Sequence, residues 1–74
     1  MNITPEQMIA TIRQLEMINM GCAPLTAILA AYPSERPVVV KGLLADMMEM
    51  EGSIRRADFA RKGEEFQIAY AINR

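Results

Sequence analysis

Apolar residues recur at two different spacings along this chain. As far as about residue 51 they follow the three-to-four-residue period of an amphipathic α-helix, whereas from residue 65 they alternate with polar residues. Strict alternation is typical of a strand with one buried face. The pattern therefore predicts helices first and strands at the C-terminal end.

The strands are predicted to form a hairpin with limbs at residues 53–61 and 65–73. A two-residue turn at Gly63-Glu64 would place Phe59 opposite Ile68, and moving the turn back by one residue leaves the same residues on the same face. The residues expected to share the buried face of the second limb are Phe66, Ile68, Tyr70 and Ile72.

Three helices are predicted before the hairpin, at residues 5–20, 24–31 and 35–51. Thr4 is a suitable N-cap for the first helix and Ser34 for the third, and a glycine follows each of these two helices. A tyrosine–proline pair ends the second, because the residue before a proline is pushed out of the helical region.

Residues placed at 100° intervals separate the faces of the helices. The residues that the first helix is expected to bury are Met8, Ile12, Leu15 and Ile18. The residues expected on the buried arc of the third helix are Val40, Leu43, Leu44, Met47 and Met50. The residues on its opposite side are small or polar. We therefore predict that this side of the third helix is exposed to solvent.

The chain has 74 residues and is expected to form one domain over residues 1–74. Seven methionines and no tryptophan predict an aliphatic, adaptable core. Because so small a domain buries a modest share of its surface, a partner protein or a homodimer mate would stabilise it.

A single cysteine, Cys22, excludes an internal disulfide and fits a reducing compartment. We interpret Cys22 as a small buried apolar residue rather than a reactive thiol. No apolar run is long enough to span a membrane, and the N-terminus lacks the pattern of a signal peptide. These features predict a cytoplasmic protein with no membrane contact.

The composition argues against an enzyme. Histidine, the commonest general base and metal ligand, is missing, and one cysteine cannot form a zinc site within the chain. The acidic pairs Asp46/Glu49 and Glu64/Glu65 are interpreted as solvated surface groups. We therefore expect no catalytic residues, no metal and no cofactor.

The run Leu44-Ala-Asp-Met-Met-Glu-Met-Glu-Gly-Ser-Ile-Arg-Arg56 joins the third helix to the first strand. It resembles the junction in the winged helix-turn-helix domain, in particular in small bacterial or phage transcription regulators of the fimbrial-operon and multiple-antibiotic-resistance kinds. The likeness continues through Lys62-Gly63 and the aromatic-rich return strand and covers residues 5–73. It implies an α+β fold with three helices and a C-terminal hairpin wing.

The resemblance also implies a DNA-binding regulator, dimeric on two half-sites, whose third helix enters the major groove while the wing lies on phosphates. The positions that it implies to face bases are Arg36, Val38, Lys41, Gly42 and Ala45. The positions that it implies to face phosphates are Arg55, Arg56, Arg61 and Lys62. Four bases and one acid between residues 53 and 63 favour such a wing, although the whole chain has a net charge of −1.

The alternative hypothesis is a protein-binding module of the same shape, such as the small proteins by which phages and other mobile elements seize a host protein. An acidic pI and abundant methionine suit that function. The apolar residues that the core needs least, and that would form its contact surface, are Met17, Met20, Val38 and Met48. Salt-dependent retention on DNA or heparin discriminates between the two hypotheses.

Overall fold

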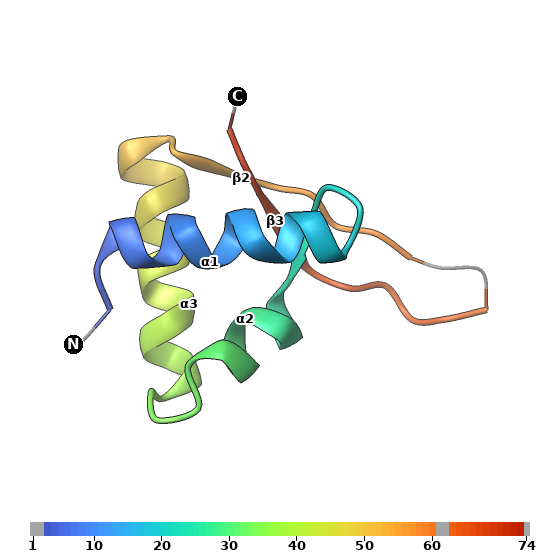
Figure 1. Ribbon diagram of the computed structural model, residues 1–74, viewed down its shortest axis with the longest axis horizontal. Helices are drawn as coiled ribbons and strands as arrows, with labels where there is room; N and C mark the ends of the chain where they lie inside the picture. The colour runs from blue at the N-terminus through green and yellow to red at the C-terminus, as the bar shows by residue number, and fades with distance from the viewer. Residues whose placement is uncertain (1–2, 61–62, 74) are drawn as a thin grey trace.

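The computed structural model describes residues 3–60 and 63–73. Within them the chain forms three α-helices and a three-stranded antiparallel sheet, which confirms the α+β class (Figure 1). The hairpin that ends the chain extends well beyond the packed helices, so that it forms an arm at one side of the molecule.

The helices are α1 (Pro5–Ile18), α2 (Leu25–Ala31) and α3 (Pro37–Asp46), and α3 runs on without a break into a π-helical turn, η1 (Met47–Glu51). Thr4 caps α1 as predicted, in a reciprocal pair of hydrogen bonds with Gln7. α1 crosses α3 in Figure 1, and buried residues of both belong to one core.

The third helix begins two residues later than predicted, at Pro37. Arg36 takes the N-cap position with φ −71° and ψ 138°, which is the extended backbone that a following proline imposes. Ser34 therefore lies outside the helix and does not cap it. At the other end Gly52 adopts the left-handed conformation that closes the helix, as expected (φ 68°).

The first helix ends two residues earlier than predicted, at Ile18. Met20 already has a left-handed backbone (φ 59°) and Gly21 follows with φ 101°. The early turn leaves the Ile18 side chain 70% exposed, against the prediction that it is buried. Glu16, two residues earlier, is buried instead, at 5% exposed.

The sheet consists of β1 (Ala23–Pro24), β2 (Ile54–Arg56) and β3 (Ala69–Ile72) in the order β1-β3-β2. β1 was not expected, because two residues carry no strand periodicity; it shortens the predicted second helix at its start. Beyond β1, the Glu16 carboxylate accepts a hydrogen bond from the Ile72 amide (3.1 Å) and so continues the pairing along that edge of β3.

The predicted hairpin is confirmed, but its pairing and its buried face differ from the prediction. Phe59 lies opposite Gln67 rather than Ile68. Ala69, Tyr70 and Ala71 are buried in succession because β3 is the central strand, whereas Phe66 and Ile68, nearer the tip, are 67% and 39% exposed. No described helix covers that outer part of the hairpin in Figure 1.

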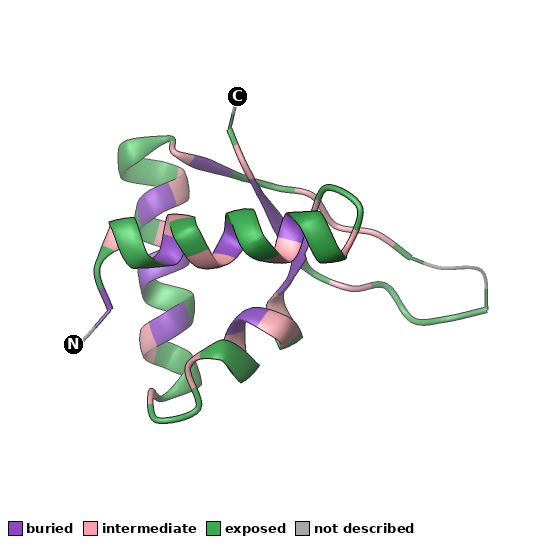
Figure 2. Ribbon diagram, in the orientation of Figure 1, coloured by how far each residue is buried: buried purple, intermediate pink, exposed green. Residues whose placement is uncertain are grey.

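Figure 2 shows the buried residues where α1, α3 and the sheet meet. The largest fully buried side chains are Met8, Ile12, Ile28, Val40, Leu44, Met47 and Ile54. Two methionines of η1 are exchanged relative to the prediction: Met50 is 82% exposed and Met48 packs partly against the core. The π-helical turn has more residues per turn than an α-helix, so the 100° spacing no longer holds after Met47.

Candidate functional site

The outer face of α3 is available to a partner, as the sequence predicted. Val40, Leu43 and Leu44 fix the helix on the core. The predicted base-facing residues lie on its other side, exposed except for the half-buried Ala45, and are Arg36, Val38, Lys41, Gly42 and Ala45. Val38 is 67% exposed, because its neighbours fill the core positions of the helix.

The N-terminus of α3 carries no side-chain cap, in contrast to α1. Arginine has no acceptor with which to cap a helix, and it stands at the N-cap position here. Pro37 has no N–H, and the N–H groups of Val39 and Val40 donate to the Arg36 carbonyl oxygen. This end of the helix therefore presents the Val38 N–H, the positive end of the helix dipole and the Arg36 guanidinium. This combination suits an anion supplied from outside the chain.

Charges along α3 and η1 run against the helix dipole. Arg36 and Lys41 lie in the N-terminal half, whereas Asp46, Glu49 and Glu51 lie towards the C-terminal end, and all five are exposed. A helix selected for its own stability has the opposite arrangement. The charges of α3 and η1 therefore do not favour the stability of the helix.

Gly42 stands in the middle of this exposed face. A Cβ added at Gly42 would meet nothing within 4 Å, so no close packing inside the molecule requires the glycine. A glycine within a helix costs about 0.5–1 kcal/mol relative to alanine. Its presence leaves the backbone open to close approach by another surface.

The hairpin cations differ in their surroundings. Arg55 is exposed on β2, and no ion pair to it is found among residues 3–60 and 63–73. Arg56 instead forms a two-pronged ion pair with Asp58, with nitrogen–oxygen distances of 2.8 and 2.6 Å, and lies 5.8 Å from the centre of the Tyr70 ring. Arg61 and Lys62, the other two predicted phosphate contacts, lie outside the described residues.

Asp58 ties the two limbs of the hairpin together where β2 ends. Besides Arg56, its Oδ1 accepts a hydrogen bond from the Ala69 amide across the hairpin (3.1 Å). The hydrogen bond from Arg56, and then that from Ala69, holds the pKa of Asp58 below its ordinary value, and the carboxylate raises the pKa of Arg56. The sequence contained a signal for this pair, because residues two apart on a strand share a face.

The four residues predicted for a protein contact do not form one surface. Met17 and Met20 are 84% and 98% exposed at the end of α1, but Val38 belongs to the face of α3 described above. Met48 is partly buried against the core. Residues that the sequence assigned to the core, Ile18, Phe66 and Ile68, are exposed instead.

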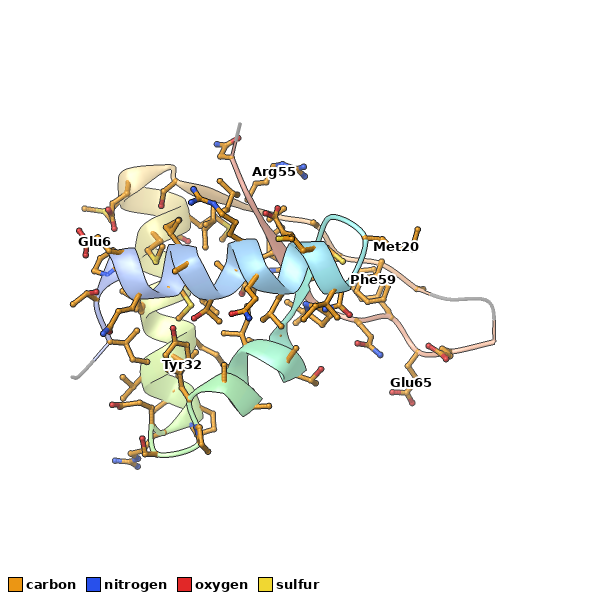
Figure 3. The ribbon with its side chains drawn as sticks, viewed as in Figure 1. Glu6, Met20, Tyr32, Arg55, Phe59 and Glu65 are labelled. Carbon is orange, nitrogen blue, oxygen red and sulfur yellow. The ribbon has the colours of Figure 1, made fainter. Side chains whose placement is uncertain are left out.

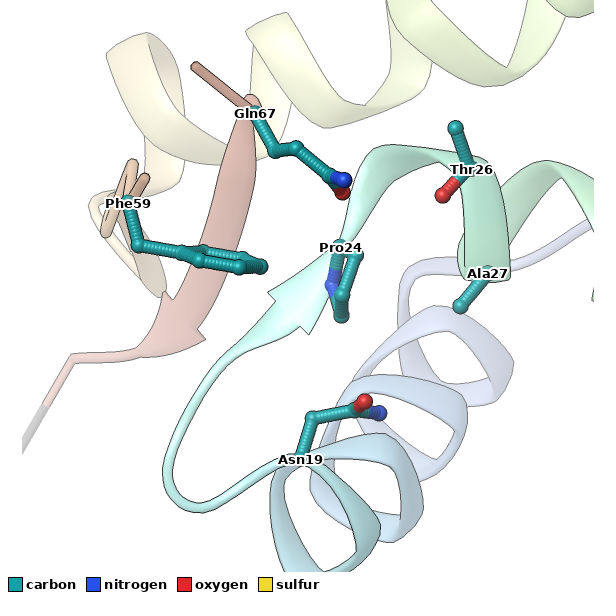
Figure 4. A pocket seen from close by; sticks show the side chains of 6 residues that line it. All are labelled: Asn19, Pro24, Thr26, Ala27, Phe59 and Gln67. Atoms are coloured by element: carbon teal, nitrogen blue, oxygen red, sulfur yellow. The ribbon is translucent and has the colours of Figure 1, made fainter. Parts of the chain in front are cut away.

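A hollow of about 340 Å³ lies between the end of α1, the start of α2 and the hairpin (Figure 4). The residues that line it are Asn19, Pro24, Thr26, Ala27, Phe59 and Gln67. In Figure 4 the Phe59 ring lies towards Pro24, and Thr26 and Gln67 line the opposite side. These groups carry no charge, so the hollow has none of the features of a metal or phosphate site.

In the described part of the chain, no group of three or more metal-ligating side chains comes together, and no helix is long and apolar enough to cross a membrane. Cys22 is half-buried, with Sγ 3.6 Å from the Asn19 carbonyl oxygen. Comparisons with protein-family models, curated proteins and solved structures find no match for the chain. The function must accordingly be argued from the geometry.

Proposed function

We propose that the chain is a winged helix-turn-helix protein that binds double-stranded DNA and regulates transcription, with the outer face of α3 in the major groove and the β2–β3 hairpin as the wing. The order of the elements supports this proposal: one helix, a short strand, two helices joined by a tight turn, and a hairpin whose last strand is central in the sheet. In such a domain the second helix of the pair enters the groove.

The observation that carries the proposal is the outer face of α3. Its N-terminal half has two cations, Arg36 and Lys41, and a helix end without a side-chain cap. Its small residues would allow the DNA to approach the helix backbone closely. Phosphates would meet the helix end and the cations, while Val38 would contact base edges such as thymine methyls. The acidic C-terminal half would be held away from the phosphates, so α3 would enter the groove by its first turns.

Arg55 is the better candidate of the two β2 arginines for a wing contact. Arg56 is already neutralised by Asp58, so a phosphate would have to compete with that carboxylate. In Figure 3 Arg55 lies beyond the C-terminal end of α3, away from the end that holds Arg36. The fifteen residues of α3 and η1 separate these ends by roughly 22 Å, which exceeds the major-groove width of about 12 Å, so the two arginines would bind phosphates on different sides of the groove.

Fluorescence anisotropy of a labelled duplex, measured over a series of salt concentrations, tests the proposal. The wild-type chain should bind with an affinity that falls as salt rises, and the variant with both Arg36→Glu and Lys41→Glu should bind at least roughly tenfold more weakly. The logarithm of its affinity should also fall less steeply with the logarithm of the salt concentration. The slope should be smaller by about one for each phosphate that the variant no longer neutralises.

Three single variants provide the comparison: Arg13→Glu, Arg55→Gln and Arg56→Gln. Arg13 is exposed on α1, outside the proposed contact, so its reversal should cost much less than reversal of a cation on α3. Arg55→Gln should weaken binding more than Arg56→Gln. Equal losses of affinity from Arg13→Glu and from Arg36→Glu alone, which change the net charge by the same amount, would mean that only net charge matters and would remove α3 from the interface.

A second candidate function is a protein-binding module. The exposed methionines at the end of α1 favour it, because they serve no core that the structure contains. If the wild-type chain shows no salt-sensitive binding to DNA, this second function becomes the better account of the fold.

A further inference from the structure

We propose that a second copy of this chain docks on an apolar surface formed by the end of α1, the start of α2 and the outer part of the hairpin. This surface, called the apolar surface below, comprises Met17, Ile18, Met20, Phe59, Phe66 and Ile68. The proposal concerns a part of the molecule away from the outer face of α3. It uses the outer part of the hairpin that is proposed as the wing, whereas Arg55, the proposed wing contact, lies in β2 at the stem, outside the apolar surface. The dimer does not depend on DNA binding.

Charge is missing from the part of this region that the end of α1 and α2 build, whereas the hairpin part carries charged residues. No charged residue occurs from Met17 to Ser34, although this stretch includes the exposed end of α1 and exposed residues of α2. Exposed helical surface that a protein keeps in water normally carries charges. The centres of protein–protein interfaces, by contrast, are depleted of charge and enriched in methionine and aromatic residues.

Three hollows that share lining residues lie next to one another across this region, and together they are called the groove below. The hollow of Figure 4 shares Asn19 and Phe59 with one of about 310 Å³, and Thr26 and Gln67 with another of about 330 Å³. Ile18 and Met20 line the first neighbour, and Phe66 and Ile68 line the second. The groove therefore runs from the end of α1, past Phe59, to the outer limb of the hairpin.

Exposed apolar side chains stand at both ends of the groove. Met20 is 98% exposed at one end and Phe66 is 67% exposed at the other. Figure 3 shows Met20 beside Phe59, where the hairpin leaves the body of the molecule. The left-handed Met20 belongs to the C-terminal cap of α1, because the N–H of the following Gly21 donates to the Glu16 carbonyl oxygen (2.8 Å). A methionine at this position costs roughly 1–2 kcal/mol relative to glycine.

This arrangement fits a second copy better than an unrelated partner because it is complementary to itself. In a two-fold dimer, a residue at one end of a surface meets the other end of the partner's surface, and the reverse contact follows by symmetry. A two-fold axis near Phe59 would bring Met20 of one chain to the hollow beside Phe66 of the other. Each copy thus supplies the projections that the groove of its mate can accept.

The size of the apolar surface also matches a dimer. Its exposed side chains present roughly 600–700 Å² of residue surface, close to the roughly 800 Å² that each partner contributes to a standard interface. Glu65 borders the groove and carries its charge outward in Figure 3, as expected at the rim of an interface.

Sedimentation equilibrium of the full chain over a series of concentrations tests the proposal. The wild-type chain should approach twice its mass of 8.3 kDa, and Met20→Asp or Phe66→Asp should weaken association at least roughly tenfold. The matched controls are Val38→Asp and Met50→Asp, which add the same charge at exposed apolar residues outside the apolar surface. Both controls should associate like the wild type.

A wild-type chain that stays monomeric at every concentration overturns the proposal, whether or not it binds a foreign protein. A dimer that the controls disrupt and the Met20 and Phe66 variants do not also overturns it. Circular dichroism verifies that each variant is folded; because the mutated side chains are exposed, folding should be retained.

Cross-linking tests the two-fold arrangement. In a Cys22→Ala background, a Met20→Cys chain mixed with a Phe66→Cys chain in a glutathione buffer should form the mixed disulfide in preference to either homodimer. Preferential homodimer formation would contradict the predicted contact between opposite ends of the surface.

Discussion

Two residues show a cost that the fold itself does not require. Gly42 occupies a helical position with open space around it, and Met20 occupies a left-handed backbone position that favours glycine. A residue with a side chain at position 42 and a glycine at position 20 would make the isolated chain more stable. Both residues lie on surfaces for which we propose a partner, α3 for DNA and the groove for a second copy.

Replacement of Gly42 by alanine is expected to stabilise the chain by about 0.5–1 kcal/mol, because alanine loses less conformational entropy in a helix. Urea denaturation followed by circular dichroism measures this change. Gly52→Ala provides the comparison and should destabilise by about 1 kcal/mol or more, because Gly52 has φ 68°. A destabilising Gly42→Ala change would show that the glycine has a structural role after all.

The sequence predicted single residues well where helical spacing held and poorly where it did not. Val38, Lys41 and Gly42 are exposed as their positions on the helix required. Met50 was misplaced because the π-helical turn shifts every residue after Met47, and no signal in the local sequence announces that turn. Ile18 was misplaced because α1 turns away early, at a methionine rather than at the glycine that follows.

At the scale of elements, the terminal signals decided what could be predicted. The Thr4 cap of α1, the closing Gly52 and the tyrosine–proline stop after α2 all operate as expected. β1 could not be predicted, because its two residues become a strand only through pairing with β3. The predicted hairpin pairing was wrong by one residue. The prediction counted outward from the turn, whereas the pairing observed in the strands places Ile54 opposite Ile72 at the stem.

The Asp58 carboxylate is expected to couple the hairpin to pH. Its pKa in the folded chain is lowered, chiefly by the hydrogen bond from Arg56, so ionised Asp58 stabilises the hairpin above the ordinary pKa of 3.8. That contribution is lost as the pH falls through the lower, folded-state pKa. Protonation should release Arg56 and weaken the bond to the Ala69 amide.

An NMR titration into the acid range measures this coupling. The side-chain carboxyl of Asp58 and the amide of Ala69 should titrate together with a midpoint below 3.8. In Asp58→Asn the transition at Ala69 should vanish, while the other amides of β3 keep their shifts at neutral pH. A midpoint at or above the ordinary value would mean that the ion pair does not persist in solution.

At the scale of the whole molecule, the distribution of charge matters more than its sum. A net charge of −1 argues against DNA binding, yet Arg36 and Lys41 lie in the N-terminal half of α3, while three of the nine acids lie towards its C-terminal end and in η1. The uncharged stretch from Met17 to Ser34 forms a different region, at the end of α1 and on α2. The net charge of the whole chain therefore does not show that two exposed cations and an uncharged stretch lie in different regions of the molecule.

The central claim, that the outer face of α3 binds DNA, is tested most directly by NMR of the isotopically labelled chain during titration with a duplex at low salt. We predict shift changes at the amides of residues 38–45 and at Arg55, with Met17, Ile18 and Met20 unchanged. Amides of residues 38–45 that stay in place while those at the end of α1 move, or a spectrum that does not change at all, would contradict the account.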